Sequence, residues 1–419
     1  MRLALSRAVA GCLALLSAAA LSACGGGGNS TSTGGTDAAG PAGKIIDVYS
    51  SLPMQGPAAA ETASIVNGIR LALAQSRGKA GPFKVQYTAL DDSAGSSGWD
   101  ANQTATNARK AAADPRAVYY IGEFDDDASE VSMPILNEAG IPQVSPANTY
   151  VALTAGAPGN YWPTGTRTYL RIVPTDAVQA AADLLAMHEA GCSKVAVASD
   201  GEAYGTGLAK LIDLQKGYYG IDVVNDAGID PSAHGLRSYA LSLKGLRADC
   251  LFVAGLASKG VVDLTKEVHA YLPTAKFFGP ADMCTSAWTN AKDGGVPATV
   301  DPLIQCTQAT QSLTAYPGGK AFLAAYRAKY PGSNPGPYAI LGYEAMRLGL
   351  STIALLGPNG DSKSAVLSEL FATTGRHSVL GTYGFNKVGD TTLKAIGLYK
   401  VGAGGDPTFD KTITPAHVL

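Results

Sequence analysis

The chain has 419 residues, which is more than one ordinary domain needs and enough for two. Hydrophobic residues make up 46% of the chain and charged residues 16%, a composition that allows large buried cores and excludes a chain disordered throughout. The formal net charge is −2 and no dense stripe of lysine and arginine occurs, which argues against a nucleic-acid partner.

The N-terminal 23 residues have the pattern of an export signal. Two arginines precede an apolar run of signal-peptide length that ends in small residues. The tail LSAC resembles a bacterial lipobox, in which cleavage leaves a diacylated cysteine, here Cys24. An ordinary secretory signal and a transmembrane anchor are the alternatives. Residues 24–43 are rich in glycine and serine, which predicts a flexible tether that would hold the folded part on the extracytoplasmic side, periplasmic or at the cell surface, lipid-anchored to the cell membrane.

From residue 45 onward, short apolar strands alternate with amphipathic helices. The strand IIDVYSS precedes a helix on which Ile65, Ile69 and Leu73 recur every four residues. The strand FKVQYTALDD, a helix over residues 100–113, the strand AVYYIG, a helix that starts at an aspartate run and the strand IPQVSP follow. This alternation predicts βαβ units around a parallel sheet.

A second unit of the same rhythm begins after TYLRIVPTDA, where Asp176 is expected to cap a new helix that ends at Gly191. The strand KVAVAS, an amphipathic helix and the strands IDVVND, DCLFVAG and KFFGP follow. Helical segments over residues 320–329 and 338–355 come next, and the chain ends in a β-rich run. The sequence therefore predicts an α/β protein with two parallel-sheet units.

Four cysteines remain beyond the signal and the expected lipid site, and an even number in an exported protein predicts disulfides. Cys192 and Cys250 each stand just before a strand of the second unit. The first and third strands of a doubly wound sheet are neighbours, so these strand starts should lie close together. Cys284 and Cys306 flank a loop after the fourth strand. We predict the pairs 192–250 and 284–306, and the absence of any CxxC pair argues against a zinc site.

Several segments occur in an order that is itself informative: LPMQGPAAAE with NGIRLAL, YIGEFDDDASEVSMPILNEAGIPQVSPANTYVALT, YLRIVPTDAVQA, VASDGEAYGTGLA, CLFVAGLASKG, FFGPADM and GTYGFNKVGD. Together they resemble the type I periplasmic-binding-protein fold, in its branch of branched-chain amino-acid-binding (leucine-binding) lipoproteins. The resemblance implies two doubly wound lobes joined by three crossovers, with a ligand cleft between them. Transferred to this chain, the first lobe would be 44–171 plus 305–390, and the second 172–304 plus 391–419.

The resemblance also implies binding residues. In SPANT an amino-acid ligand would be held through the backbone at Ala147 and the hydroxyl of Thr149, and Tyr204 would line the second-lobe side of the cleft. The acid that meets the ligand ammonium in amino-acid binders is expected at Ala281, so the neighbouring Asp282 would take over that role. The alternatives are structural: Thr149 would cap a turn, Tyr204 would pack at a helix start, and Asp282 would cap a helix.

Three places depart from the family's pattern. Aromatic residues of the family are replaced near Glu61 and by Leu256. The largest departure is the run Asp125, Asp126 and Asp127, because amino-acid binders hold the ligand α-carboxylate at this turn with small hydroxyl residues. A carboxylate at Asp126 would repel that group. Either the aspartates cap the helix and complement its dipole, or the ligand carries a cation or several hydrogen-bond donors. A metal site is the weaker option, because three adjacent acids at a helix start point in different directions.

The resemblance implies a solute-binding lipoprotein that delivers a small polar molecule, an amino acid or an amide- or amine-like compound, to the permease of an ABC importer. A ligand sensor with a membrane signalling partner needs the same cleft and stays open as the alternative. The five histidines stand in no metal or triad motif, and no GxSxG, P-loop or HExxH occurs. We therefore expect no enzyme activity, no cofactor and no metal.

Overall fold

The computed structural model describes residues 43–228 and 235–419. The expected signal peptide, Cys24 and all of the expected tether but its last residue lie outside them. Across the described part of the chain, no helix is both long enough and apolar enough to cross a membrane.

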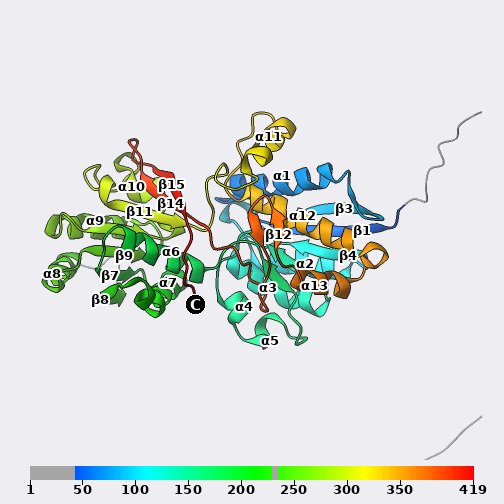
Figure 1. Cartoon of the computed structure of the whole chain (residues 1–419), viewed down its shortest axis with the longest axis horizontal. Coiled ribbons are helices and arrows are strands. Elements are labelled where there is room, and N and C mark those ends of the chain that lie inside the picture. Colours follow the sequence, from blue (N-terminus) through cyan, green and yellow to red (C-terminus); the bar gives the residue numbers. More distant parts are fainter. Residues whose placement is uncertain (1–42, 229–234) are drawn as a thin grey trace, which may run out of the picture. The chain divides into compact units, whose positions relative to one another are not determined.

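The first lobe is built on a six-stranded sheet with the order β2-β3-β1-β4-β5-β6 (Figure 1). Its strands are β1 (Ile45–Leu52), β2 (Lys79–Ala80), β3 (Phe83–Asp91), β4 (Ala117–Ile121), β5 (Gln143–Ser145) and β6 (Tyr169–Arg171). All neighbouring strands are parallel except β2 and β3, which form an antiparallel pair. The alternation read from the sequence therefore predicts this sheet correctly.

Helices cover both faces of this sheet. On one face α1 (Ala59–Gln75) packs beside α12 (Ala339–Leu355), which is drawn in orange although α1 is blue, and α13 (Lys363–Phe371) lies with them (Figure 1). On the other face lie α2 (Ala101–Ala113) and α3 (Asp126–Glu138). Tyr119 of β4 packs on the first face and Tyr120 on the second, because successive strand side chains alternate. The lobe also contains η1 (Gly95–Ser97), α4 (Ala152–Ala155), α5 (Pro158–Tyr161), α11 (Gly319–Lys329), η6 (Gly357–Asn359), β12 (Arg376–Ser378) and β13 (Gly381–Tyr383).

The second lobe is built on a seven-stranded sheet with the order β15-β14-β11-β10-β9-β7-β8. Its strands are β7 (Lys194–Ser199), β8 (Asp222–Gly228), β9 (Cys250–Ala254), β10 (Lys276–Gly279), β11 (Ile304–Gln308), β14 (Ile396–Val401) and β15 (Pro407–Ile413). Strands β8, β7, β9, β10 and β11, neighbours in that order, are all parallel. Strands β14 and β15 add an antiparallel edge beside β11.

Helices again flank this sheet on both faces. The helices α6 (Asp176–Glu189) and α7 (Ala203–Gln215) pack on one face, and α8 (Leu236–Leu246) and α9 (Lys259–Tyr271) on the other. The short elements are η2 (Lys216–Tyr219), η3 (Ala281–Met283), α10 (Ser286–Thr289), η4 (Ala291–Asp293) and η5 (Asp301–Leu303). The expectation that Asp176 caps α6 is wrong by one residue. Thr175 has the extended N-cap backbone and Asp176 is the first helical residue, where its charge complements the helix dipole.

The chain passes between the two sheets three times, after β6, after β11 and before β14. The second of these passages differs from the sequence expectation. Strand β11 pairs with β10 and β14, so residues 305–308 belong to the sheet of the second lobe. The first-lobe segment was expected to return at 305, whereas residues 305–308 pair with β10 and β14 and lie in the second sheet.

Both predicted disulfides are present in the second lobe. Cys192 and Cys250 have Cα atoms 5.8 Å apart, and Cys284 and Cys306 have Cα atoms 5.5 Å apart. The first pair ties the segment before β7 to the start of β9, which are neighbouring strands, as the doubly wound order predicts. The second ties β11 to the turn after β10.

Removing the Cys192–Cys250 disulfide is expected to destabilise the protein more than removing the other one. The sequence separations are 58 and 22 residues, for which the loop-entropy relation gives about 4 and about 3 kcal/mol. Urea unfolding of residues 44–419 would measure this, with the pairs Cys192→Ala/Cys250→Ala and Cys284→Ala/Cys306→Ala. A larger loss for the second pair would contradict the entropic explanation.

Candidate functional site

The candidate site is formed where the parallel strands of the first lobe end. Strand β4 ends at Ile121 and α3 begins at Asp126, so the aspartate run occupies this strand–helix turn as predicted. Asp125 stands at the N-cap, but its side chain makes no capping hydrogen bond, and its Oδ2 has no partner. The simple capping role considered for the run is therefore not what the side chain of Asp125 performs.

The carboxylate of Asp126 faces the loop that follows β5. Its Oδ1 accepts a hydrogen bond from the backbone N–H of Tyr150 at 3.2 Å. Desolvation by burial raises the pKa of Asp126 to about 7, with a further contribution from the carboxylate of Asp176, while the amides of Thr149 and Tyr150 and the charge of Arg171 act in the opposite direction. Asp126 is thus a partly buried acid on the wall formed by residues 146–150.

This loop carries two of the residues singled out in the sequence, Ala147 and Thr149. Ala147 is buried, and its N–H donates to Oγ of Ser145 at 3.1 Å, which shapes the turn. The carbonyl of Thr149 accepts the backbone N–H of Asp176 at 2.9 Å. Thr149 therefore joins the first-lobe loop to the first residue of helix α6.

Arg171, at the end of β6, holds this loop from behind. Its side chain is 0% exposed, and Nε donates to Oδ1 of Asp390 at 2.7 Å. Nη1 donates to the carbonyl of Tyr150 at 2.7 Å, and Nη2 to Oγ1 of Thr154 at 2.6 Å. Its guanidinium group is thus committed to the structure of the loop, and its charge is balanced by Asp390.

The second lobe contributes Asp176, Tyr204 and Asp282. Burial, with the hydroxyl of Thr149 and the charge of Arg171 opposing, raises the pKa of Asp176 to about 6, and the carboxylate of Asp282 adds to the rise. The carboxylates of Asp176 and Asp282 also raise the pKa of the Tyr204 phenol, after burial as the first cause. The predicted residues Tyr204 and Asp282 stand, like Asp176, at the starts of elements that follow the carboxyl ends of strands: α7 follows β7, η3 follows β10 and α6 follows β6.

Tyr338 belongs to this group, although the sequence analysis did not single it out. Its ring packs edge-on against Phe124 with centroids 5.7 Å apart, and its N–H donates to Oε1 of Glu61 at 2.9 Å. Its phenol has a raised pKa, first through burial and then through Glu61, Asp282 and Asp126. Tyr338 therefore lies beside Glu61, near which a family aromatic was expected to be replaced. No signal in the sequence links residue 338 to residues 124 and 61.

Two further carboxyl groups meet in the core below the aspartate run. Asp92 and Glu123 are both 0% exposed. Ser51 donates to Oδ2 of Asp92 at 3.2 Å, and the hydroxyl of Tyr120 donates to Oε1 of Glu123 at 2.8 Å. Burial raises the pKa of Asp92 to about 6, and burial together with the charge of Asp92 raises the pKa of Glu123 well above its usual value. Both groups are therefore harder to ionise than exposed acids.

These raised pKa values predict that the ligand-free protein loses stability as the pH rises from 5 to 8. Asp92, Asp125 and Asp176 have pKa values of about 6 and Asp126 of about 7, all above 3.8. An acid with a raised folded pKa stabilises the fold fully below its unfolded pKa and loses that contribution as the pH passes its folded pKa. Acids with lowered pKa values have completed their opposite contribution near pH 5. We expect the melting temperature at pH 5 to exceed that at pH 8 by about 2 °C or more; calorimetry at constant ionic strength would measure it.

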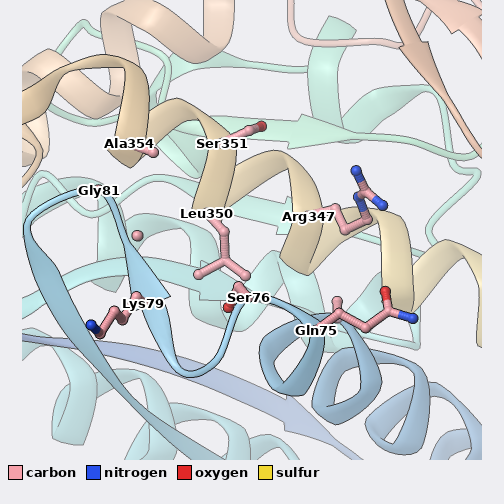
Figure 2. Close-up of a pocket in the computed structure, with 10 residues that line it drawn as sticks. Gln75, Ser76, Lys79, Gly81, Arg347, Leu350, Ser351 and Ala354 are labelled. Carbon is pink, nitrogen blue, oxygen red and sulfur yellow. The ribbon is translucent and has the colours of Figure 1, made fainter.

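The hollow shown in Figure 2 lies elsewhere. It has a volume of about 290 Å³ and is lined by α1, β2 and α12, with Lys79 and Arg347 among its residues. Gly81 lines this hollow and lies in the turn before β3. The hollow is therefore at the amino ends of the strands, whereas Asp126 is at their carboxyl ends. Ligands of open α/β sheets bind outside the carboxyl ends, so this hollow is not the candidate site.

The described residues offer little to a metal ion. Within 43–228 and 235–419, the one group of three close donor side chains is Cys192, Asp249 and Cys250. The two cysteines form a disulfide and have no thiolate to give. The acids around Asp126 do not converge closely enough to form such a group.

Comparison with known proteins supports the architecture described above. The profile of the periplasmic binding protein family matches residues 50–406. The Leu/Ile/Val-binding protein BraC3 of Rhizobium johnstonii is 26% identical over 359 residues, which cover 84% of this chain and 90% of that protein. An amino acid binding protein of Pseudomonas aeruginosa is 22% identical over 286 residues, 68% of this chain and 72% of that protein.

Solved structures give the same fold with different ligands. An ABC transporter substrate-binding protein from Desulfitobacterium hafniense in complex with Leu has a TM-score of 0.70 at 19% identity, covering 88% of this chain and 100% of that one. A solute-binding protein of an ABC transporter from R. palustris in complex with benzoate has a TM-score of 0.64 at 19% identity, covering 90% and 98%. At these identities the likeness shows the fold alone.

Proposed function

Because the chain belongs to the periplasmic binding protein family, in its type I, branched-chain amino-acid-binding-like branch, we propose that it is an extracytoplasmic solute-binding protein of an ABC importer. It would bind a small polar ligand between its lobes and present the closed form to a permease. No catalytic role is part of this proposal, in keeping with a family and neighbours that bind solutes.

One observation supports the proposal: polar residues of both lobes stand at the carboxyl ends of their strands, and the lobes are joined there by the hydrogen bond from the N–H of Asp176 to the carbonyl of Thr149. Asp126 and Thr149 come from the first lobe, and Asp176, Tyr204 and Asp282 from the second. In the closed form a ligand contacts residues of both lobes, whereas in the open form it contacts fewer of them. Binding therefore favours closure. We assign ligand contacts to Asp126, Ala147, Thr149, Tyr204 and Asp282.

A thermal-shift screen of residues 44–419 would test solute binding. The panel contains amino acids, amides, polyamines, sugars and aromatic acids. A ligand at about 100 times its Kd adds about 2.7 kcal/mol of stability, which is readily seen as a rise in melting temperature. A panel in which no compound raises the melting temperature would contradict the proposal. Co-purification of the full chain with a permease supports import, whereas co-purification with a receptor kinase supports sensing.

Membrane attachment through Cys24 is the second part of the proposal, carried by the LSAC motif and the Gly/Ser-rich segment behind it. Cys24→Ala is expected to prevent lipid attachment and to move the protein from the membrane fraction to the soluble fraction. Metabolic labelling with a radioactive fatty acid, in parallel with Cys12→Ala as the control, would measure this. Equal labelling of the Cys24→Ala and unmodified chains would contradict it.

A further inference from the structure

The structure places an anion of the protein itself at the start of helix α3. Asp126 is the first residue of that helix, and its Oδ1 accepts a hydrogen bond from the backbone N–H of Tyr150. The positive end of a helix dipole and free amides are what would otherwise attract a ligand carboxylate. Here Asp126 engages the loop amide, and its own charge repels a second carboxylate at this place.

Asp176 faces the same space with an unpaired oxygen. The residue is 4% exposed, and its Oδ1 has no hydrogen-bond partner. It stands beside the loop that Asp126 engages, because the backbone N–H of Asp176 donates to the carbonyl of Thr149 at 2.9 Å and the next residue, Tyr150, donates to Asp126. A buried oxygen without a donor is costly unless something supplies one, and this oxygen therefore points to a ligand that carries a donor.

No basic side chain among the described residues fills that role. Within residues 43–228 and 235–419, no lysine or arginine forms an ion pair with Asp126, Asp176 or Asp282. Arg171 acts on the first two from a distance, but its donors are used by Asp390, by Thr154 and by backbone carbonyls. Among the described residues, the acids at the starts of α3, α6 and η3 therefore have no basic side chain paired with them.

The aromatic rings near these acids suit the same ligand. The ring of Tyr338 packs against Phe124, two residues before Asp126, with centroids 5.7 Å apart, and Tyr204 lies in the first turn of α7, where the carboxylates of Asp176 and Asp282 help to raise the pKa of its phenol. Ring faces attract cations and also pack against an alkyl chain. Because the three acids come from separate elements and do not converge on one point, an extended organic cation fits them better than a single metal ion.

On the premise that the protein is a solute-binding protein, we propose that its ligand is an organic cation, an alkyl ammonium or guanidinium compound without a carboxylate. Its N–H groups donate to Asp176 and Asp282, its charge is balanced by these residues and Asp126, and its alkyl part lies against Tyr204 and Tyr338. Amino acids, although bound by relatives of this chain, are discriminated against by Asp126.

Pairs of compounds that differ only in a carboxylate test this directly. Calorimetric titration of the soluble chain with leucine against 3-methylbutylamine, and with arginine against agmatine, isolates the effect of that group. The expected result is binding of at least one amine, with an affinity about 10-fold or more above that of its amino-acid counterpart. Asp176→Asn, which keeps the shape of the side chain, is expected to weaken amine binding by about 10-fold or more. Asp127→Asn removes a charge from the neighbouring exposed position and is expected to leave amine binding unchanged.

The outcomes separate this inference from the proposed function. Tighter binding of leucine or arginine than of the matched amine would overturn the cation assignment and leave solute binding in place. Binding of benzoate in preference to every amine would do the same. An amine that binds Asp176→Asn and the unmodified protein equally would overturn the placement of the cation beside Asp176. A failure of all four compounds would overturn the cation assignment, and only a failure of the whole solute panel would overturn solute binding.

Discussion

Asp126→Asn is expected to stabilise the ligand-free protein at pH 8 and, in the same molecule, to weaken binding of an organic cation. The pKa of Asp126 is raised to about 7, so at pH 8 the folded protein carries a charge that burial and the carboxylate of Asp176 disfavour. Asparagine removes this charge, and its Oδ1 can still accept the N–H of Tyr150. Near pH 5 Asp126 is protonated in the folded protein, so Asp126→Asn removes no charge there and is expected to give no stabilisation.

The two effects are measured on the same preparation. Calorimetric melting at pH 5 and pH 8 gives the stability, and we expect a rise of about 2 °C at pH 8 only. Because Asp126 balances the charge of the ligand, titration with the bound amine is expected to show a loss of affinity of about 10-fold or more. Asp127→Asn is the matched control, since it removes an equal charge from an exposed position. Destabilisation at pH 8 would show that the attraction between Asp126 and Arg171 outweighs burial.

Asp126→Ser tests the same position with a side chain of the kind that amino-acid binders carry. The hydroxyl can donate to a carboxylate, and the amide of Tyr150 is released from Asp126. We expect this variant to lose affinity for amines and to gain measurable binding of leucine or another amino acid. An unchanged preference would show that Asp126 does not set the ligand class.

The pattern of strands and helices was readable because burial imposes it locally. The aspartate run, for example, begins α3 as predicted, because the apolar strand before it and the amphipathic helix after it have different periods. The Cys192–Cys250 disulfide followed from strand order, and the Cys284–Cys306 disulfide from the position of its cysteines on either side of one loop. The boundary at β11 was missed because its partners β10 and β14 are fixed by long-range pairing, which no local pattern encodes.

The site was readable only in part, for the same reason. Thr149 and Asp126 are 23 residues apart, and the contact between their segments depends on the packing of β4 against β5. Tyr338 and Asp176 reach the site from helices whose sequence patterns report only burial. The sequence predicted the chemistry of single residues. That Asp126 and Asp176 both adjoin the loop at Thr149 and Tyr150 was visible only in the fold.

Asp390→Ala is expected to be among the most destabilising single substitutions in the first lobe. It would leave the guanidinium of Arg171, which is 0% exposed, without its counter-charge. Loss of one partner of a buried pair costs about 3–5 kcal/mol, and the lower end applies because the Asp390 side chain is 18% exposed. The double variant Arg171→Met/Asp390→Leu is expected to lose less, since no uncompensated charge remains. Urea unfolding of the single and double variants would measure the coupling.

Asp390→Ala is also expected to lower the affinity for the ligand, an effect that a general loss of stability would not produce. Arg171 holds the carbonyl of Tyr150 at 2.7 Å, and the N–H of Tyr150 orients Asp126. Displacing this loop therefore displaces an acid of the site. Glu344→Ala is the matched control, because Glu344 pairs with Arg376 at 2.7 Å in the same lobe but contacts no site residue named above. We expect comparable destabilisation from both variants and a loss of ligand affinity only from Asp390→Ala. Equal loss of affinity in the two would show that Arg171 acts on the site through stability alone.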